Sequence, residues 1–306
     1  MQRTVARAAT LNGRGLHSGT SVTVRLLPAG AGHGIWFRRT DVTDRDAMVP
    51  ASWDVVAPAE LCTRLVNPEG VEVRTVEHLM AALAGCGIGN ALIEIDGPEV
   101  PILDGSSLPF VEAILDAGVL EQGAASRVIE VLCPVEVRRG GALARLEASE
   151  SPAIEFHIDF ADAAIGRQSR AMSMANGAFV RELCDSRTFC RRGDVETMRS
   201  RGLALGGTFE NAIVVDGARV LTPGGLRRAD EPVRHKMLDA LGDLALAGAP
   251  IVGRYVGVRA GHRLTNDLLR ALFARPDAFR VRTCDASLAG RLPGAGLVAR
   301  DLPAAA

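Results

Sequence analysis

The sequence lacks the features that mark several classes of protein. Its six cysteines include no CxxC pair, which argues against a structural zinc site built from thiolates and indicates a reduced, cytoplasmic protein. No basic-then-apolar leader opens the chain, and no apolar run is long enough to span a bilayer, although peripheral contact with a membrane stays open. With 35 basic and 36 acidic residues, the chain has no excess positive charge for binding nucleic acid. The expected partner is therefore a small molecule.

The length and composition of the chain predict two domains. A chain of 306 residues can form two cores of ordinary size. The segment 121–127 is small and polar, and a strand pattern restarts at 128, so we place the domains at 1–123 and 127–306. Both parts mix short strands with helices, which predicts an α+β fold in which helices cover a sheet. Sequence similarity between the two parts is too weak to establish a repeat.

Hydrophobic periodicity places the expected elements. In the first part we expect strands at 21–26, 34–38 and 91–95, and helices at 75–83 and 108–117. In the second part we expect strands at 135–147, 154–160, 212–216 and 251–259, and helices near 177–184, 230–248 and 265–274.

The stretch 230–244 carries the strongest local signal. An acidic pair followed by Pro232 is typical of a helix start. Within this helix, His235, Asp239 and Asp243 lie on one stripe opposite an apolar face, so the stripe faces a cleft or solvent. A His and an Asp one turn apart can bind one metal ion, but such pairs are more often solvated surface residues. A third ligand from elsewhere would favour the metal.

Glu77 and His78 supply the missing groups. They are adjacent in the first turn of the helix expected at 75–83, so their side chains project on neighbouring faces. His78 would complete a set of three ligands with His235 and Asp239, which is the number that a catalytic zinc takes while keeping one position open for water. Glu77 could then accept a proton from that water.

Two further histidines lie in turns. His262 lies between the strand expected at 251–259 and the following helix, a common place for functional side chains. Asp243 could keep this imidazole protonated and oriented, as an acid for a leaving amine. His17 lies in a glycine-rich turn, where a solvated histidine is the more common case. A loop histidine is also more often structural than catalytic. The role considered for His262 therefore does not prove the role of Asp243, or the reverse.

Nine runs of the chain are unusual in combination: GLHSG at 15–19, RRTD at 38–41, LCT at 61–63, TVEHL at 75–79, PILDGS at 101–106, RTF at 187–189, GGTFEN at 206–211, VRHKMLD at 233–239 and GH at 261–262. In these runs the chain resembles the UDP-3-O-acyl-N-acetylglucosamine deacetylases, zinc hydrolases that commit bacteria to lipid A synthesis. The similarity extends nearly from end to end.

The resemblance implies a two-domain sandwich in which each domain has a sheet and two helices of similar topology, with the active site between the domains. It implies a monomer that uses Zn²⁺ to hydrolyse the 2-N-acetyl group of UDP-3-O-(3-hydroxyacyl)-N-acetylglucosamine, releasing acetate. It also implies roles for eight residues: zinc ligands His78, His235 and Asp239, general base Glu77, general acid His262, its partner Asp243, the oxyanion-stabilising hydroxyl of Thr188, and Lys236 in the polar cluster.

The chain departs from the family pattern at two places. After Phe189 it has Cys190, Arg191 and Arg192, where the family has glycine and then apolar residues that line a passage for the acyl chain. Thr265 stands where the family has asparagine. The first departure leaves the preferred acyl chain open, and we expect both arginines to point outward, because arginines beside apolar walls commonly extend toward water.

Three alternatives to this function remain. A paralogue could deacetylate another N-acetylated sugar, and the apolar character of the folded segment 189–208 would separate the two. A binding protein that keeps the fold without catalysis would be expected to lack a ligand or the base, and all of them are present. A thiol-based enzyme is disfavoured because no cysteine neighbours a histidine in these runs.

Overall fold

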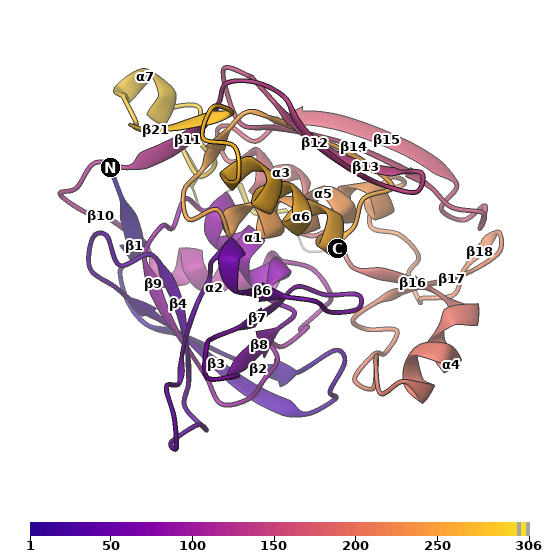
Figure 1. Cartoon of the computed structure of the whole chain (residues 1–306). Helices are drawn as coiled ribbons and strands as arrows, with labels where there is room; N and C mark the ends of the chain where they lie inside the picture. Colours follow the sequence, from indigo (N-terminus) through magenta and orange to yellow (C-terminus); the bar gives the residue numbers. More distant parts are fainter. Residues whose placement is uncertain (299–300, 304–306) are drawn as a thin grey trace.

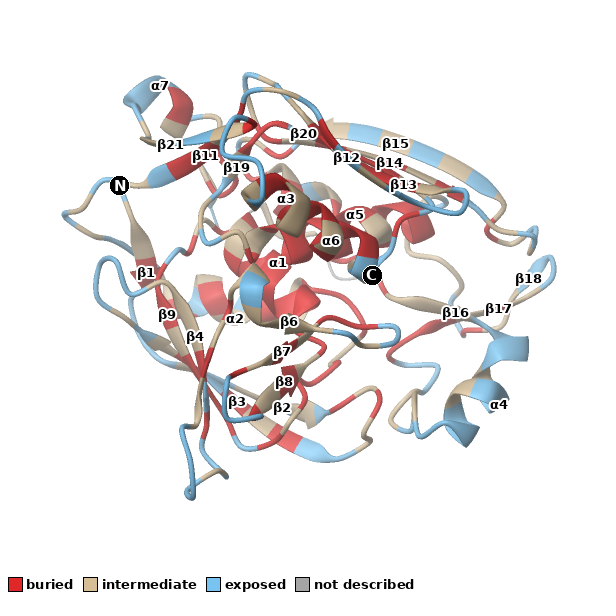
Figure 2. Ribbon diagram, viewed as in Figure 1, coloured by how far each residue is buried: buried red, intermediate tan, exposed pale blue. Residues whose placement is uncertain are grey.

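The computed structural model describes residues 1–298 and 301–303. Two five-stranded sheets enclose a layer of helices, and the most buried segments of the chain lie in that layer (Figures 1 and 2). One continuous hydrophobic cluster extends through residues of both halves of the chain. The α+β class and the sandwich arrangement are therefore confirmed.

The two large sheets share one topology. The first has the order β2 (Ala9–Arg14), β3 (Ser21–Pro28), β9 (Ala91–Ile95), β4 (Ile35–Arg39), β5 (Met48–Pro50). The second has the order β12 (Val135–Arg139), β13 (Ala142–Glu147), β20 (Arg254–Val258), β14 (Ala153–Asp159), β15 (Arg167–Ser173). In each sheet the central strand pairs in parallel with one of its two neighbours, β9 with β4 and β20 with β14. All the other strand pairs of these sheets are antiparallel.

Four helices fill the middle layer, and each half contributes two in the same relation to its central strand. In the first half α1 (Glu77–Gly85) precedes β9 and α2 (Leu108–Ala117) follows it. In the second half α5 (Glu231–Ala245) precedes β20 and α6 (His262–Phe273) follows it. Where α1 meets α5, a Cβ atom added to Gly242 would lie only 2.0 Å from the Glu77 carbonyl oxygen. This glycine therefore lets the two helices approach closely beside the candidate site.

Smaller elements surround the two sheets. They are β1 (Arg3–Val5) with β10 (Val119–Glu121); η1 (Trp53–Val55); β6 (Val56–Ala57), β7 (Arg64–Val66) and β8 (Glu72–Arg74); β11 (Arg127–Val131), β19 (Ile251–Val252) and β21 (Phe279–Thr283); β16 (Phe189–Arg191), β17 (Ile213–Asp216) and β18 (Arg219–Val220); and α3 (Ala178–Glu182), α4 (Arg192–Ser200) and α7 (Ala286–Ala289).

Most predicted elements are present, but one functional residue lies in a different setting. α6 begins at His262, so this histidine is the first residue of a helix and the prediction of a loop position was wrong. Gly261 precedes it in extended conformation and offers no capping side chain, which removes the usual sequence signal of a helix start. The expected strand at 251–259 is divided at Gly253 into β19 and β20.

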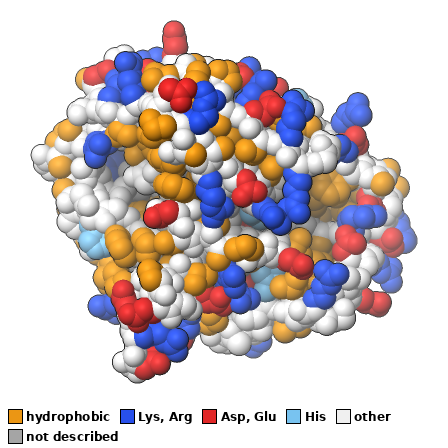
Figure 3. All heavy atoms as spheres, in the orientation of Figure 1, with side chains coloured by type: hydrophobic (Ala, Val, Ile, Leu, Met, Phe, Trp, Pro, Cys, Tyr) orange, Lys and Arg blue, Asp and Glu red, His pale blue; other side chains and the backbone are white. Residues whose placement is uncertain are grey.

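The surface carries both signs of charge, and basic and acidic side chains are interspersed on the face drawn in Figure 3. Among the described residues, no helix combines the length and the apolar character that a membrane span requires. Residues 122–126 connect β10 to β11, and the gap between the two predicted domains, 124–126, lies within this connection.

Candidate active site

Three potential metal ligands converge where α1 crosses α5. The ligand atoms of His78, His235 and Asp239 all lie within 4.8 Å of one another, and the three residues are buried. Asp239 Oδ1 lies 3.3 Å from His235 Nε2 and 3.5 Å from His78 Nε2. His235, Asp239 and Asp243, the stripe that was predicted to face a cleft or solvent, are thus buried against α1.

The hydrogen bonds of His235 show why this cluster suits a cation. Its Nδ1 lies 3.0 Å from the carbonyl oxygen of Ser186, which can only accept, so Nδ1 carries the proton. Burial lowers the pKa of His235 to about 3, so the ring is neutral and Nε2 presents a lone pair. That lone pair faces Asp239 Oδ1, an acceptor that has no hydrogen-bond partner among the described residues. Two acceptors facing each other in a buried site fit a metal ion between them.

Lys236 holds the other oxygen of the Asp239 carboxylate. Its Nζ donates to Asp239 Oδ2 at 2.5 Å, and only 16% of its side chain is exposed. Burial opposes the charged forms of both groups, but each stabilises the charge of the other, so the pKa of Lys236 is raised and that of Asp239 is lowered. Lys236 is also the only lysine among the 35 basic residues of the chain. All the other basic residues are arginines, whose guanidinium group is larger and planar. At this position the chain instead has a compact ammonium group.

A second cluster joins α1, α5 and the start of α6. His262 Nδ1 lies 2.9 Å from Asp243 Oδ2, and its Nε2 lies 3.5 Å from Glu77 Oε1. Burial alone would lower the pKa of His262, but the surrounding carboxylates, with Asp243 foremost, raise it to about 9. Burial raises the pKa of the Glu77 carboxyl. The Glu77 carboxylate, which has an increased proton affinity, therefore lies beside the protonated ring of His262. The nitrogen of His262 nearest to it is Nε2.

Two residues of this cluster were missed by sequence reasoning. Thr63 donates its main-chain N–H to Glu77 Oε2 at 3.1 Å and its hydroxyl to Asp243 Oδ1 at 2.5 Å. Asn266 donates to the Thr63 hydroxyl oxygen at 3.2 Å. Thr63 belongs to one of the runs on which the resemblance rests, but nothing local in the sequence assigns it a partner 180 residues away. It fixes the carboxylates of Glu77 and Asp243 relative to each other.

The chain is similar to one family of known proteins. The family model described as UDP-3-O-acyl N-acetylglycosamine deacetylase matches residues 2–274. A relative named UDP-3-O-acyl-N-acetylglucosamine deacetylase from Phenylobacterium zucineum is 51% identical over 288 residues, covering 94% of this chain and 98% of the relative. Relatives of the same name from Shewanella frigidimarina and Shewanella oneidensis are each 44% identical, covering 96% of this chain and 98% and 97% of their own lengths.

The chain belongs to the UDP-3-O-acyl N-acetylglycosamine deacetylase family. The family model extends over the candidate metal ligands and the Glu77–His262–Asp243 cluster, since all of them precede residue 274.

In this member of the deacetylase family, Thr188 lies in the loop before β16, next to Phe189, whose ring approaches that of His235. The main-chain N–H of Thr188 donates to the Gly105 carbonyl at 2.7 Å, and the hydroxyl belongs to a half-buried residue. Two residues earlier, Ser186 supplies the carbonyl that orients His235. Arg187 and Glu231 form a buried ion pair at 2.9 Å that ties this loop to the start of α5. The same segment thus orients a candidate metal ligand and contains the predicted oxyanion group.

The two arginines that depart from the deacetylase family pattern point away from the site. Arg191 pairs with Asp162 at 2.5 Å, and Arg192 pairs with Asp216 at 3.3 Å. Their side chains are 47% and 65% exposed. Phe189 points inward instead, with its ring centroid 6.1 Å from that of His235. The expected outward orientation of both arginines is confirmed.

Proposed function

We propose that this chain hydrolyses the 2-N-acetyl group of UDP-3-O-(3-hydroxyacyl)-N-acetylglucosamine and releases acetate, a step of lipid A biosynthesis. The observation that carries the proposal is the convergence, in a chain of the deacetylase family, of three buried ligand atoms with the Glu77–His262–Asp243 cluster. Hydrolysis of an amide needs an attacking water, a base to activate it and an acid for the departing nitrogen. This site offers one candidate for each proton transfer.

We further propose that the ion is Zn²⁺, held by His78, His235 and Asp239. Two imidazoles and one carboxylate form a donor set typical of catalytic zinc, which leaves a position open. When bound, such an ion acts as a Lewis acid that polarises the amide carbonyl and makes water more acidic. Lys236 keeps Asp239 ionised and leaves Oδ1 free to face both histidines.

Glu77 and His262 divide the proton transfers in this proposal. Glu77, whose pKa is raised by burial, accepts a proton from the attacking water at Oε1, the oxygen that Thr63 leaves free. His262 gives a proton from Nε2 to the departing nitrogen, while its Nδ1–H stays hydrogen-bonded to Asp243. Asp243 stabilises the imidazolium and fixes its orientation. Thr188 donates its hydroxyl to the carbonyl oxygen as negative charge develops there.

The outward arginines support an acylated substrate. Because Arg191 pairs with Asp162 and Arg192 with Asp216, they leave Phe189 and the apolar side chain of Leu203 free to contact an acyl chain. Leu61, Met198 and Leu203 together line a cavity of about 290 Å³. Each methylene of an acyl chain buried there contributes about 0.8 kcal/mol.

We place the protein in the cytoplasm, as a monomer of two domains at 1–123 and 127–306. All six cysteines are free, which agrees with a reducing compartment. Contact with the surface of a membrane, where an acylated substrate would gather, stays compatible with this placement.

The test compares acetate release from substrates that differ only in the 3-O-acyl chain. We expect the specificity constant to rise steadily with chain length and to exceed that for unacylated UDP-N-acetylglucosamine by several orders of magnitude, on the order of tenfold for every two buried methylenes. Equal rates with and without the acyl chain would refute the substrate while leaving amide hydrolysis in place. Absence of acetate release from every N-acetylated sugar nucleotide would refute the activity itself.

A further inference from the structure

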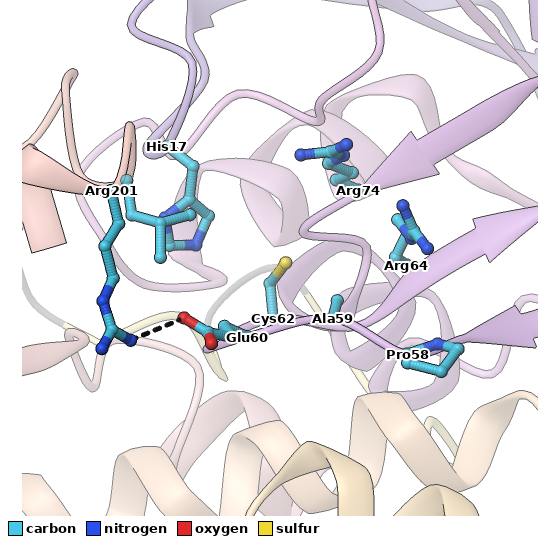
Figure 4. A pocket seen from close by; sticks show the side chains of 9 residues that line it. His17, Pro58, Ala59, Glu60, Cys62, Arg64, Arg74 and Arg201 are labelled. Atoms are coloured by element: carbon cyan, nitrogen blue, oxygen red, sulfur yellow. Dashed lines mark hydrogen bonds and ion pairs between the residues drawn. The ribbon is translucent and has the colours of Figure 1, made fainter.

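A cavity of about 480 Å³ lies beside the candidate active site (Figure 4). Its wall includes Cys62, and the next residue, Thr63, donates its main-chain N–H to Glu77. Cys62 is therefore adjacent in the chain to a residue that is hydrogen-bonded to the proposed base. In Figure 4, Arg64 and Arg74 lie along one side of Cys62, and His17 and Arg201 lie on the other.

Two arginines face each other across the strands that form this wall. Arg64 of β7 is directly opposite Arg74 of β8 in the antiparallel register. Like charges in that relation destabilise a sheet. A single carboxylate serves both, because Glu72 Oε2 lies 3.1 Å from Arg64 Nη1 and Glu72 Oε1 lies 2.7 Å from Arg74 Nε. Arg64, Arg74 and Glu72 together carry one net positive charge, and the buried Glu99, which is paired with Arg74 in an isolated β-bridge, is a further carboxylate near them.

The same wall contains hydrogen-bond donors without partners. Arg64 Nε and His17 Nε2 are both buried and have no hydrogen-bond partner among the described residues. His17 Nδ1 accepts the main-chain N–H of Ala204 at 3.3 Å, which places the proton of the neutral ring on Nε2. Buried donors without acceptors are costly, and an anionic ligand would supply the acceptors.

The described residues that line the cavity include no further free anion. Glu60 is paired with Arg201 at 3.4 Å, as the dashed line in Figure 4 marks. Burial raises the pKa of the Cys62 thiol to about 12, so the thiol carries no charge. Outside the lining, Glu72 is shared between the two arginines, and Glu99 accepts from the main-chain N–H groups of His17 and Ser18 and from the Thr75 hydroxyl.

We infer that this cavity is an oxyanion subsite that Arg64 and Arg74 form beside the reaction centre. Arginine presents several N–H groups in a planar fork that matches the oxygens of a carboxylate or a phosphate. The inference rests on the proposed function for the identity of the anion, because that reaction offers two: the acetate that it releases and the diphosphate of its nucleotide sugar. The cavity would hold one of these oxyanions next to the candidate active site.

The inference is tested by direct binding of two probes to the purified protein, ¹³C-acetate and UDP, each followed by NMR titration. Replacing both arginines, Arg64→Gln with Arg74→Gln, removes charge-assisted hydrogen bonds and should weaken binding of the responsible probe about tenfold or more. Arg280 and Arg282 provide a matched control, because they share Glu130 in the same way on another sheet. Their double replacement by glutamine should leave both affinities unchanged.

A third variant guards against misfolding. Glu72→Gln removes the shared negative charge, so it should tighten binding of the same probe, an effect that an unfolded chain cannot produce. A response limited to acetate identifies a product subsite, and a response limited to UDP identifies a diphosphate subsite. Unchanged affinity for both probes in all variants would overturn the inference, even if acetate release is normal. Arginine-dependent binding without any acetate release would instead refute the proposed function and leave the subsite standing.

Discussion

At the scale of residues, the site depends on hydrogen bonds that fix which ring nitrogen is free. The Ser186 carbonyl accepts from His235 Nδ1, which leaves Nε2 as a lone pair for a metal. The Asp243 carboxylate accepts from His262 Nδ1, which leaves Nε2 with a proton to donate. The roles proposed for these two histidines therefore differ, because His235 faces a neutral acceptor in a buried place and His262 faces carboxylates.

The single lysine leads to a prediction at this scale. Lys236→Arg keeps the positive charge but replaces a compact ammonium by a planar guanidinium in a place that is 84% buried, so Asp239 must shift. We expect the rate of acetate release to fall by up to about 10²-fold, the cost of a misplacement of about 1 Å in an active site. The reverse change on the surface, Arg263→Lys, is the matched control and should have no effect, since Arg263 is 64% exposed. Full activity of Lys236→Arg would contradict this role for the ammonium.

Some residues of the site were predictable from sequence and others were not. The helical spacing of His235, Asp239 and Asp243 predicted their shared stripe, because it depends only on local geometry. Thr63 and the carbonyl of Ser186 contact the site from distant parts of the chain, so no local pattern indicated them. Burial of the stripe was also undetermined, because periodicity does not distinguish a cleft from solvent.

At the scale of elements, the close approach of α1 and α5 brings the ligands together. Gly242 permits this approach because it has no side chain to meet the main chain of Glu77. Elements with clear end signals were predicted well, and α2 was predicted with its observed bounds at 108–117. The helix α4 was missed because it has no buried residues and so shows no apolar stripe.

Gly242→Ala tests the helix crossing. The added methyl group would overlap main-chain atoms that cannot move aside, so we expect the free energy of unfolding to fall by about 1 to 3 kcal/mol. Gly193 in α4 is the matched control, because a Cβ atom there meets nothing within 4 Å. Gly193→Ala should be neutral or should stabilise the protein by up to about 1 kcal/mol, the difference in helix propensity. Urea unfolding of both variants gives the comparison, and equal stability would contradict close packing at Gly242.

At the scale of the whole molecule, the repeated topology places the site between two similar halves. Each half contributes a five-stranded sheet and two helices, and the candidate ligands come from both, with His78 on α1 and two more on α5. The sequence showed no convincing repeat, because strand order and helix placement can persist without similar residues. Since the ligands join the two halves, loss of the metal should also loosen the contact between them.

The most direct test of the central claim is the zinc content of the purified protein and two variants, measured by mass spectrometry together with acetate release. The unaltered protein should carry about one zinc per chain. Asp239→Ala removes a ligand and should lower both zinc content and activity. Glu77→Gln lies beside the ligands but binds no metal in this account, so it should keep its zinc while activity falls by about 10² to 10⁴. Full zinc content in Asp239→Ala would contradict the site.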